Sequence, residues 1–293
     1  MAQRTRLGII GGSGLYQIAG FELIEERCVQ TPWGEPSDAL RFGQICGVEA
    51  VFLARHGRGH RLGPSDINYR ANIDAFKRAG VTDVISLSAC GSLREELAPG
   101  AFVLVDQFID RTFARASSFF GPGLVAHVSM AEPVCPRLLD ALEIAAREAN
   151  VPHRRGGTYL AMEGPHFSTR AESALYRSWG CDVIGMTNMP EAKLAREAEL
   201  PYASVAMVTD YDCWRDERAP VEVSTIVSVL KANAAKACAL LERLAPLIGP
   251  ERSPSPLGIE TCLDAAIITA PEARDRAMAG KLSAVAGRAL NKD

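Results

Sequence analysis

Short apolar runs alternate with helix-like stretches along most of this chain, and that alternation is the feature that most constrains its fold. Strand-like runs are expected at residues 6–10, 21–28, 39–42, 49–54, 84–87, 102–105, 158–162, 182–186 and 202–209. Helical segments are expected at about 66–78, 138–149, 169–179 and 225–244, with one more that starts at Pro190. The alternation predicts a single α/β domain of three layers, in which helices flank a mixed central sheet.

The end of the chain has a different character. A linker-like segment, Glu251-Arg-Ser-Pro-Ser-Pro, separates residues 1–250 from an Ala-rich tail. We therefore expect one domain at 1–250 and a partly helical tail at 251–293, with a single helix over 271–290. Such a tail packs either on its own domain or on a neighbouring subunit, and the sequence does not choose between them.

Composition excludes several classes of protein. The formal net charge of the 293-residue chain is −3, so no basic excess indicates binding to nucleic acid. The sequence has neither a long apolar N-terminal region nor an apolar run of about 18 residues, which favours a cytoplasmic protein without membrane contact. The eight cysteines include no C-x-x-C pair and the five histidines no helical H-x-x-x-H pair, so we expect no metal.

Small or basic residues follow several of the expected strands. Their shared feature is a hydroxyl, an exposed amide or a cationic group that can hold an anion; they are Ser13, Arg55, His56, Ser88, Ala89 and Thr187. Taken separately, Arg55 and His56 could be a surface arginine beside a histidine whose hydrogen bonds are already made, and residues 88–92 could be a plain tight turn. Together, at strand ends, they suit the ligand crevice of an open α/β sheet and favour a bound phosphate.

The first glycine cluster, GIIGGSG, invites comparison with a dinucleotide-binding loop. Gly12-x-Gly14 is followed by Tyr16 and Gln17, so the third glycine that lets a helix approach the strand is missing. A nicotinamide dehydrogenase is therefore disfavoured.

The stretch VTDYDCW ends an apolar run with two carboxylates, Asp210 and Asp212. Buried carboxylates without partners cost free energy, so the pair needs an explanation. The residues alone leave open a metal site, a helix cap, two solvated loop acids, or acids that wait for a ligand.

Nine stretches of this chain occur in the order found in one known family. They are GIIGGSGL, FLARHGRGH, NYRANIDAFKRAG, ACGSLREELAPG, DQFIDRT, MAEPVCP, MEGPHFSTRAES, GMTNMPEAKLARE and TDYDCW. Over about residues 6–248 the sequence resembles the trimeric purine nucleoside phosphorylase family. The resemblance implies a nucleoside phosphorylase-like fold, a homotrimer with sites at subunit interfaces, and inorganic phosphate as co-substrate without a further cofactor. The tail after Pro250 has no counterpart in that comparison.

Site residues follow from the resemblance by motif. Phosphate contacts fall on Ser13, Arg55, His56, Ser88, Ala89 and Thr187, the same anchors named above. Met186 would hold the ribose and Phe167 would stack on the purine, although a core aromatic is the alternative for Phe167. Ser168 and Val223 would shape substrate choice, and His127 would reach the 5′ pocket of a neighbouring subunit.

In the resemblance, Asp210 lies near purine N7 and Asp212 near the 6-position. Carboxylates accept the N–H of a 6-amino group, whereas two anions would repel a 6-oxo group, so the pair implies adenine. Asp210 would act as the catalytic acid at N7, directly or through water. The implied substrate is S-methyl-5′-thioadenosine, with 5′-deoxyadenosine as a possible second substrate. Broader activity on adenosine or inosine is the alternative, and a binding protein without turnover is a third.

Overall fold

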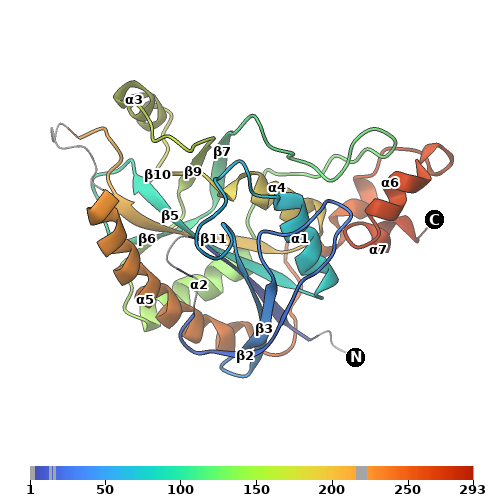
Figure 1. The fold of residues 1–293 in the computed structure, drawn as a ribbon, viewed down its shortest axis with the longest axis horizontal. Helices are drawn as coiled ribbons and strands as arrows, with labels where there is room; N and C mark the ends of the chain where they lie inside the picture. The colour runs from blue at the N-terminus through green and yellow to red at the C-terminus, as the bar shows by residue number, and fades with distance from the viewer. Residues whose placement is uncertain (1–3, 13–14, 16–17, 216–222, 293) are drawn as a thin grey trace.

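The computed structural model describes residues 4–12, 15, 18–215 and 223–292, with the backbone alone for 223–227. The described part of the chain forms one 11-stranded sheet with helices on both faces (Figure 1). The strands are β1 (Arg6–Gly11), β2 (Phe21–Arg27), β3 (Leu40–Ile45), β4 (Val48–Ala54), β5 (Asp83–Ser92), β6 (Phe102–Val105), β7 (Gln107–Arg111), β8 (His153–Arg155), β9 (Thr158–Met162), β10 (Val183–Gly185) and β11 (Tyr202–Asp210).

The sheet is mixed, as the sequence predicted. β1 pairs in parallel with β4 and β5, whereas β2, β3 and β4 form an antiparallel edge. The sequence did not predict β7 or β8. Both are short, and each pairs with a neighbour through few residues.

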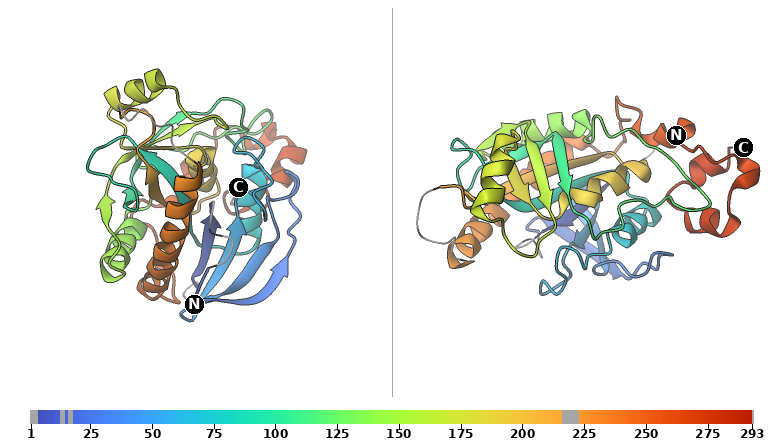
Figure 2. Two further views of the ribbon diagram at one scale, coloured as in Figure 1. Left: turned by 60° about the vertical axis from the view of Figure 1, so that its left-hand side comes forward. Right: turned by 90° about the horizontal axis from the view of Figure 1, so that it is seen from above.

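Two apolar cores cover the two faces of the sheet. The helices are α1 (Tyr69–Arg78), α2 (Pro136–Glu148), α3 (Arg170–Ser178), α4 (Asn188–Glu197) and α5 (Val223–Ile248). One core packs α2 and α5 against the sheet, and the other contains α1, α4 and the C-terminal segments. Figure 2 shows the resulting layers from two further directions, which confirms the three-layer prediction.

Local sequence signals explain where some helices begin. α3 starts in the predicted capping box, because Thr169 accepts from the backbone of Glu172 while the Glu172 carboxylate accepts from the backbone of Thr169. The predicted start of α1 at Ser65 and Asp66 is wrong. Asn68 caps that helix by accepting from the backbone N–H of Ala71, and Ser65 bonds to Glu163 instead.

Strand β5 is central to the sheet and longer than predicted. Residues 83–87 pair with β1, 84–91 with β11, and 91–92 with β10. The alternative of a plain tight turn at 88–92 is therefore excluded, because β11 and β10 continue the pairing past the last bond to β1. Between Leu87 and Gly91, one edge of β5 pairs with neither β1 nor β10.

The tail is not the single helix that the sequence predicted over 271–290. It forms 3₁₀ turns η1 (Ile259–Ala265) and η2 (Pro271–Ala273) and the short helices α6 (Arg276–Lys281) and α7 (Gly287–Leu290). Its apolar side chains join the core that contains α4. Arg288 bonds to Glu199 at 2.6 and 2.7 Å, directly after α4. The tail therefore packs on its own chain, as a part of this core.

Candidate active site

A cavity of about 350 Å³ opens where several strands end. The ends of β1, β4, β9, β10 and β11 and the unpaired edge of β5 all contribute to its wall. The sequence-predicted residues that line it are Arg55, His56, Ser88, Ala89, Phe167, Met186, Thr187, Asp210 and Asp212. The crevice at the strand ends thus brings together the anion-binding and the acidic candidates in one place.

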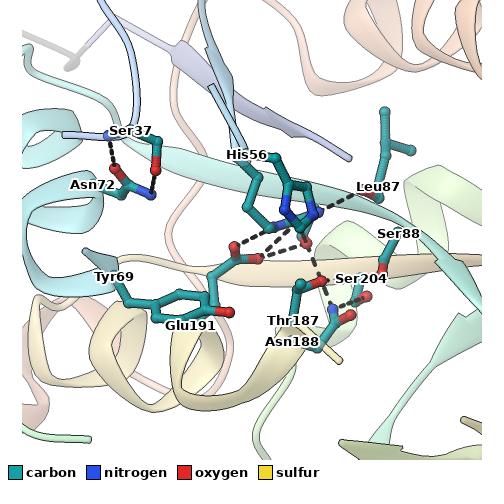
Figure 3. A network of polar contacts seen from close by, with 12 residues as sticks. Ser37, His56, Tyr69, Asn72, Leu87, Ser88, Thr187, Asn188, Glu191 and Ser204 are labelled. Atoms are coloured by element: carbon teal, nitrogen blue, oxygen red, sulfur yellow. Dashed lines mark hydrogen bonds and ion pairs between the residues drawn. The ribbon is translucent and has the colours of Figure 1, made fainter. Parts of the chain in front are cut away.

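Arg55 is fully buried at one end of the cavity and its guanidinium is held on three sides. Nε donates to Glu191 at 2.8 Å, and Nη2 donates to Glu191 and Ser86 at 3.2 and 2.6 Å. Nη1 donates to the carbonyl of Leu87 at 3.0 Å, an arrangement visible in Figure 3. These bonds occupy four of the five N–H groups of an arginine. The Nε and Nη2 side of the guanidinium binds Glu191, and one N–H of Nη1 is left for an anion.

The pair of Arg55 and Glu191 belongs to a buried polar network beneath the cavity. The Glu191 carboxylate also accepts from the hydroxyls of Ser86 and Tyr202, at 2.6 and 2.9 Å. Asn188 extends the network by donating to Tyr202 and to Ser204, and Figure 3 shows the second of these bonds. Burial opposes the charge of Arg55, but the Glu191 carboxylate holds the Arg55 pKa above its ordinary value. The network therefore keeps a permanent cation fixed at this end of the cavity.

Ser88, Ala89 and Thr187 lie next to one another beside Arg55. The hydroxyls of Ser88 and Thr187 are 3.3 Å apart. Leu87 accepts from the backbone of Gly12 on the β1 edge, and successive strand residues turn their amides to opposite edges. Ala89, two residues further on, therefore turns its N–H toward the unpaired edge. A buried amide needs a partner, and an anion in the cavity would supply one.

Asp210 and Asp212 lie at the other end of the cavity. The Asp210 carboxylate accepts from the hydroxyl of Thr209 at 2.7 Å and from the backbone N–H of Asp212 at 2.8 Å. The Oδ2 atom of Asp212 is buried, and no described residue hydrogen-bonds to it. Gly91 faces both acids, and a Cβ there would lie 3.1 Å from Asp210 Oδ1, so the strand can approach them only because it lacks a side chain.

The environment of both acids favours their neutral forms. Burial raises the pKa of Asp210, although its two hydrogen bonds act in the opposite direction. Burial also raises the pKa of Asp212; the nearby Ser173 hydroxyl acts in the opposite direction, and the charge of Asp210 adds to the rise. Two acids that face one cavity with raised pKa values can supply a proton and accept hydrogen bonds from a ligand.

Between these two ends the wall is mostly apolar. Phe167, with 64% of its surface exposed, and Met186 line it, together with Met162, Ile184 and Leu230. Ser168 does not line the cavity, but its hydroxyl lies 3.5 Å from the sulfur of Met162. An exposed aromatic face above an apolar wall suits a flat heterocycle.

Of the remaining predicted residues, two cannot be placed by side chain and one lies away from the cavity. Ser13 lies outside the described residues, and so does the side chain of Val223. His127 is exposed and does not line the cavity. Its backbone N–H donates to the carbonyl of Ala266 in the tail, and it borders a separate hollow with Lys193 and Glu197.

Sequence reasoning missed several residues that shape the cavity. Glu191 was not singled out, although it lies four residues after Thr187 in GMTNMPEAK. Arg115 was also missed; its buried guanidinium donates to the carbonyls of Met186 and Glu163, at 2.5 and 2.6 Å. His60 lines the cavity and stacks on His56, with ring centroids 4.2 Å apart. No local pattern marks the roles of Glu191 and Arg115, because each depends on a partner far away in the sequence.

Among the described residues, no group of three or more His, Cys, Asp or Glu side chains is arranged to hold a metal ion. No helix in the described ranges is long and apolar enough to cross a membrane.

The cavity can hold an anion at one end and a flat, hydrogen-bonding base at the other. The family model of the phosphorylase superfamily matches residues 6–246, and the chain belongs to that superfamily. Among its relatives, the S-methyl-5′-thioadenosine phosphorylase of Bradyrhizobium diazoefficiens is 62% identical over 284 residues, 97% of this chain and 98% of that protein. The enzyme of the same name from Rhodospirillum rubrum is 60% identical over 284 residues, 97% of each chain.

Solved structures agree with these relatives. A methylthioadenosine phosphorylase from an Antarctic soil metagenomic library matches with a TM-score of 0.90 and 46% identity, over 96% of this chain and 98% of that one. A Schistosoma mansoni methylthioadenosine phosphorylase in complex with adenine matches with a TM-score of 0.81 and 40% identity, over 84% and 92%. Since several of these proteins match 96–97% of this chain, the tail has counterparts after all, and the sequence-based statement to the contrary is wrong.

Proposed function

We propose that this chain catalyses the phosphorolysis of S-methyl-5′-thioadenosine, which yields adenine and 5-methylthio-ribose 1-phosphate. The observation that carries the proposal is the pairing, in one cavity, of a buried cation at one end with two acids at the other. The names of the relatives support the same substrate. The chemistry is the transfer of a pentosyl group from a nitrogen of the base to an oxygen of phosphate.

Recognition of the base rests on Asp212. Its buried Oδ2 has no described hydrogen-bond donor, so a 6-amino group would supply the missing N–H. A 6-oxo group would present a lone pair to the same oxygen and leave both atoms unsatisfied, at a cost of roughly 1–3 kcal/mol. The broader alternative, which included inosine, is therefore not favoured.

Phosphate binding rests on the groups at the other end. The free N–H of Arg55 Nη1, the Ser88 and Thr187 hydroxyls and the Ala89 amide surround a volume suited to a tetrahedral oxyanion. The predicted contact at Ser13 would complete the set. Because the network of Arg55 and Glu191 is rigid before the anion arrives, little reorganisation is needed when it binds.

The proposed reaction begins with cleavage of the glycosidic bond, whose electron pair leaves with adenine. The ribosyl group becomes cationic, and the phosphate held on its opposite face stabilises that charge and forms the new C–O bond. Asp210 supplies a proton at N7 of the departing adenine, directly or through water. Because the pKa of Asp210 is raised, a larger fraction of this group carries the proton to be donated than in an ordinary aspartate.

The 5′ end of the substrate would meet an apolar surface. Met186 and Leu230 line the cavity, and Val223 begins the helix that carries Leu230. A methylthio group suits such a lining because it needs no hydrogen-bond partner. His127 lies outside this cavity in its own chain, which is consistent with a role in the cavity of a neighbour, and we therefore propose a homotrimer. A cytoplasmic location and the absence of a cofactor other than phosphate are also expected.

The test is release of free base from S-methyl-5′-thioadenosine, adenosine and inosine, each measured with and without phosphate. We expect phosphate-dependent release that is fastest with S-methyl-5′-thioadenosine and negligible with inosine. Release that does not need phosphate, or equal rates with inosine, would contradict the proposal.

A further inference from the structure

His56 lies beside Arg55 at the anion-binding end of the cavity, and the orientation of its ring is fixed. Nδ1 lies 2.9 Å from the carbonyl oxygen of Leu62. A carbonyl oxygen can only accept, so Nδ1 must carry the hydrogen. In the neutral ring the other nitrogen, Nε2, then carries a lone pair, and no described residue hydrogen-bonds to it.

The surroundings of His56 favour the neutral ring. Burial lowers the pKa of His56 to about 4; the hydrogen bond to Leu62 acts in the opposite direction, and the charges of Arg55 and His60 add to the lowering. Arg61 packs on the adjacent Gly57 and adds a further positive charge nearby. Glu191 on α4 is already bonded to Arg55 at 2.8 Å, so its charge is engaged there.

We propose that His56 makes the site selective for oxyanions that carry a proton, because its Nε2 accepts a hydrogen bond from the P–O–H group of hydrogen phosphate. The inference rests on the proposed function and adds the reason for the choice of anion. The protonated oxygen is held at His56, and an unprotonated oxygen is left to attack the sugar. No proton is gained or lost when hydrogen phosphate binds in this way.

Sulfate provides the contrast. It is tetrahedral and carries two negative charges, like hydrogen phosphate, but it has no proton near neutral pH. Sulfate would face the Nε2 lone pair with an anionic oxygen, so it could bind well only if His56 took up a proton from water. Each unit rise in pH above the pKa of the free histidine should then weaken sulfate binding about tenfold. Arsenate, which is also protonated, should behave like phosphate.

The experiment is calorimetric titration of the intact protein with phosphate, arsenate or sulfate at pH 7.5 and 9, in two buffers of different ionisation enthalpy. We expect sulfate to take up about one proton and to lose about 30-fold in affinity over this range. We expect phosphate and arsenate to take up almost none and to change by less than threefold. Equal proton uptake by all three anions, or sulfate affinity independent of pH, would overturn the inference.

Two variants test whether the pH dependence of sulfate binding comes from His56 or from another histidine. His56→Gln offers an amide that can donate without taking up a proton, so the pH dependence of sulfate binding should disappear. His153→Gln is the matched control, because His153 also bonds a carbonyl, that of Val151, through Nδ1 at 2.8 Å but lies outside the cavity. It should keep the wild-type behaviour, and loss of the pH dependence in this control would count against the inference.

The same titrations distinguish the two proposals. Anions that bind as described, to a protein that releases no base from any nucleoside, would refute the proposed function alone. Phosphate-dependent base release with no difference between sulfate and phosphate would refute the role of His56 alone. If no anion bound at all, both proposals would fall.

Discussion

Replacement of Glu191 by glutamine is the sharpest test of the buried network beneath the cavity. The wild-type carboxylate accepts four hydrogen bonds: two from Arg55 at 2.8 and 3.2 Å, one from Ser86 at 2.6 Å and one from Tyr202 at 2.9 Å. Glutamine keeps the shape but removes the charge and turns one acceptor into a donor. Even in its better orientation, the amide faces the Nε–H of Arg55 with another N–H.

The expected magnitude follows from that geometry. Removal of one partner from a buried ion pair leaves an uncompensated charge and typically costs 3–5 kcal/mol. Arg55 has no exposed surface, so water cannot replace the lost acceptor. We expect the free energy of unfolding to fall by roughly 3–5 kcal/mol, which a domain of ordinary stability can survive. The KM for phosphate should rise more than the KM for the nucleoside, because the displaced group is the anion-binding cation.

Urea denaturation at pH 8 measures the first effect, and initial rates at varied phosphate measure the second. Glu197→Gln is the matched control, since Glu197 lies on the same helix and is also buried, but its carboxylate bonds Ser118 and the backbone of Phe119 rather than an arginine. A loss below about 1 kcal/mol in Glu191→Gln, or an equal loss in both variants, would refute the reasoning.

Three further predictions use other parts of the structure. Burial raises the pKa of Glu197 to about 7 from an ordinary 4.5, so the folded state binds the proton more tightly than the unfolded one. Stability should fall by at most roughly 3 kcal/mol as the pH rises from about 4.5 to 7, and Glu197→Gln should lack this fall in urea titrations across that range. Asp210→Ala should lower kcat far more than it changes the KM for phosphate, and unchanged turnover would argue against the acid role. Asp212→Asn, whose amide can donate to a 6-oxo group, should shift the ratio of kcat/KM toward 6-oxopurine nucleosides about 100-fold, roughly 3 kcal/mol, and unchanged preference would argue against the recognition role. Gly185→Ala would place a Cβ 1.9 Å from the Tyr159 hydroxyl and should lower Tm strongly, while Gly280→Ala, with no atom within 4 Å, should not; similar Tm values would contradict the packing argument.

The sequence predicted best what depends on neighbouring residues. The capping box at Thr169 was found because both of its partners lie within four residues. The strand-end anchors could be grouped because strand ends of an open α/β sheet meet at one crevice. Arg55, Ser88 and Thr187 therefore came together as expected, although 132 residues separate the first from the last.

The failures have a common physical cause, which is dependence on distant partners. The sequence left a tight turn at residues 88–92 open, but pairing with β11 and β10 keeps them in a strand. The tail reads as one helix, but its docking against α4 breaks it into short pieces. Arg55 was expected to contact phosphate, and only the fold reveals that Glu191, 136 residues away in the sequence, binds most of its guanidinium.

The unpaired edge of β5 has a consequence for how this protein can vary. An amide of the main chain belongs to every residue type except proline, so the donor that the strand offers at position 89 does not depend on which side chain stands there. Alanine could be exchanged for another small residue without loss of that donor. Proline alone would remove this N–H, and the unpaired edge of β5 would then offer no hydrogen-bond donor to an anion at position 89.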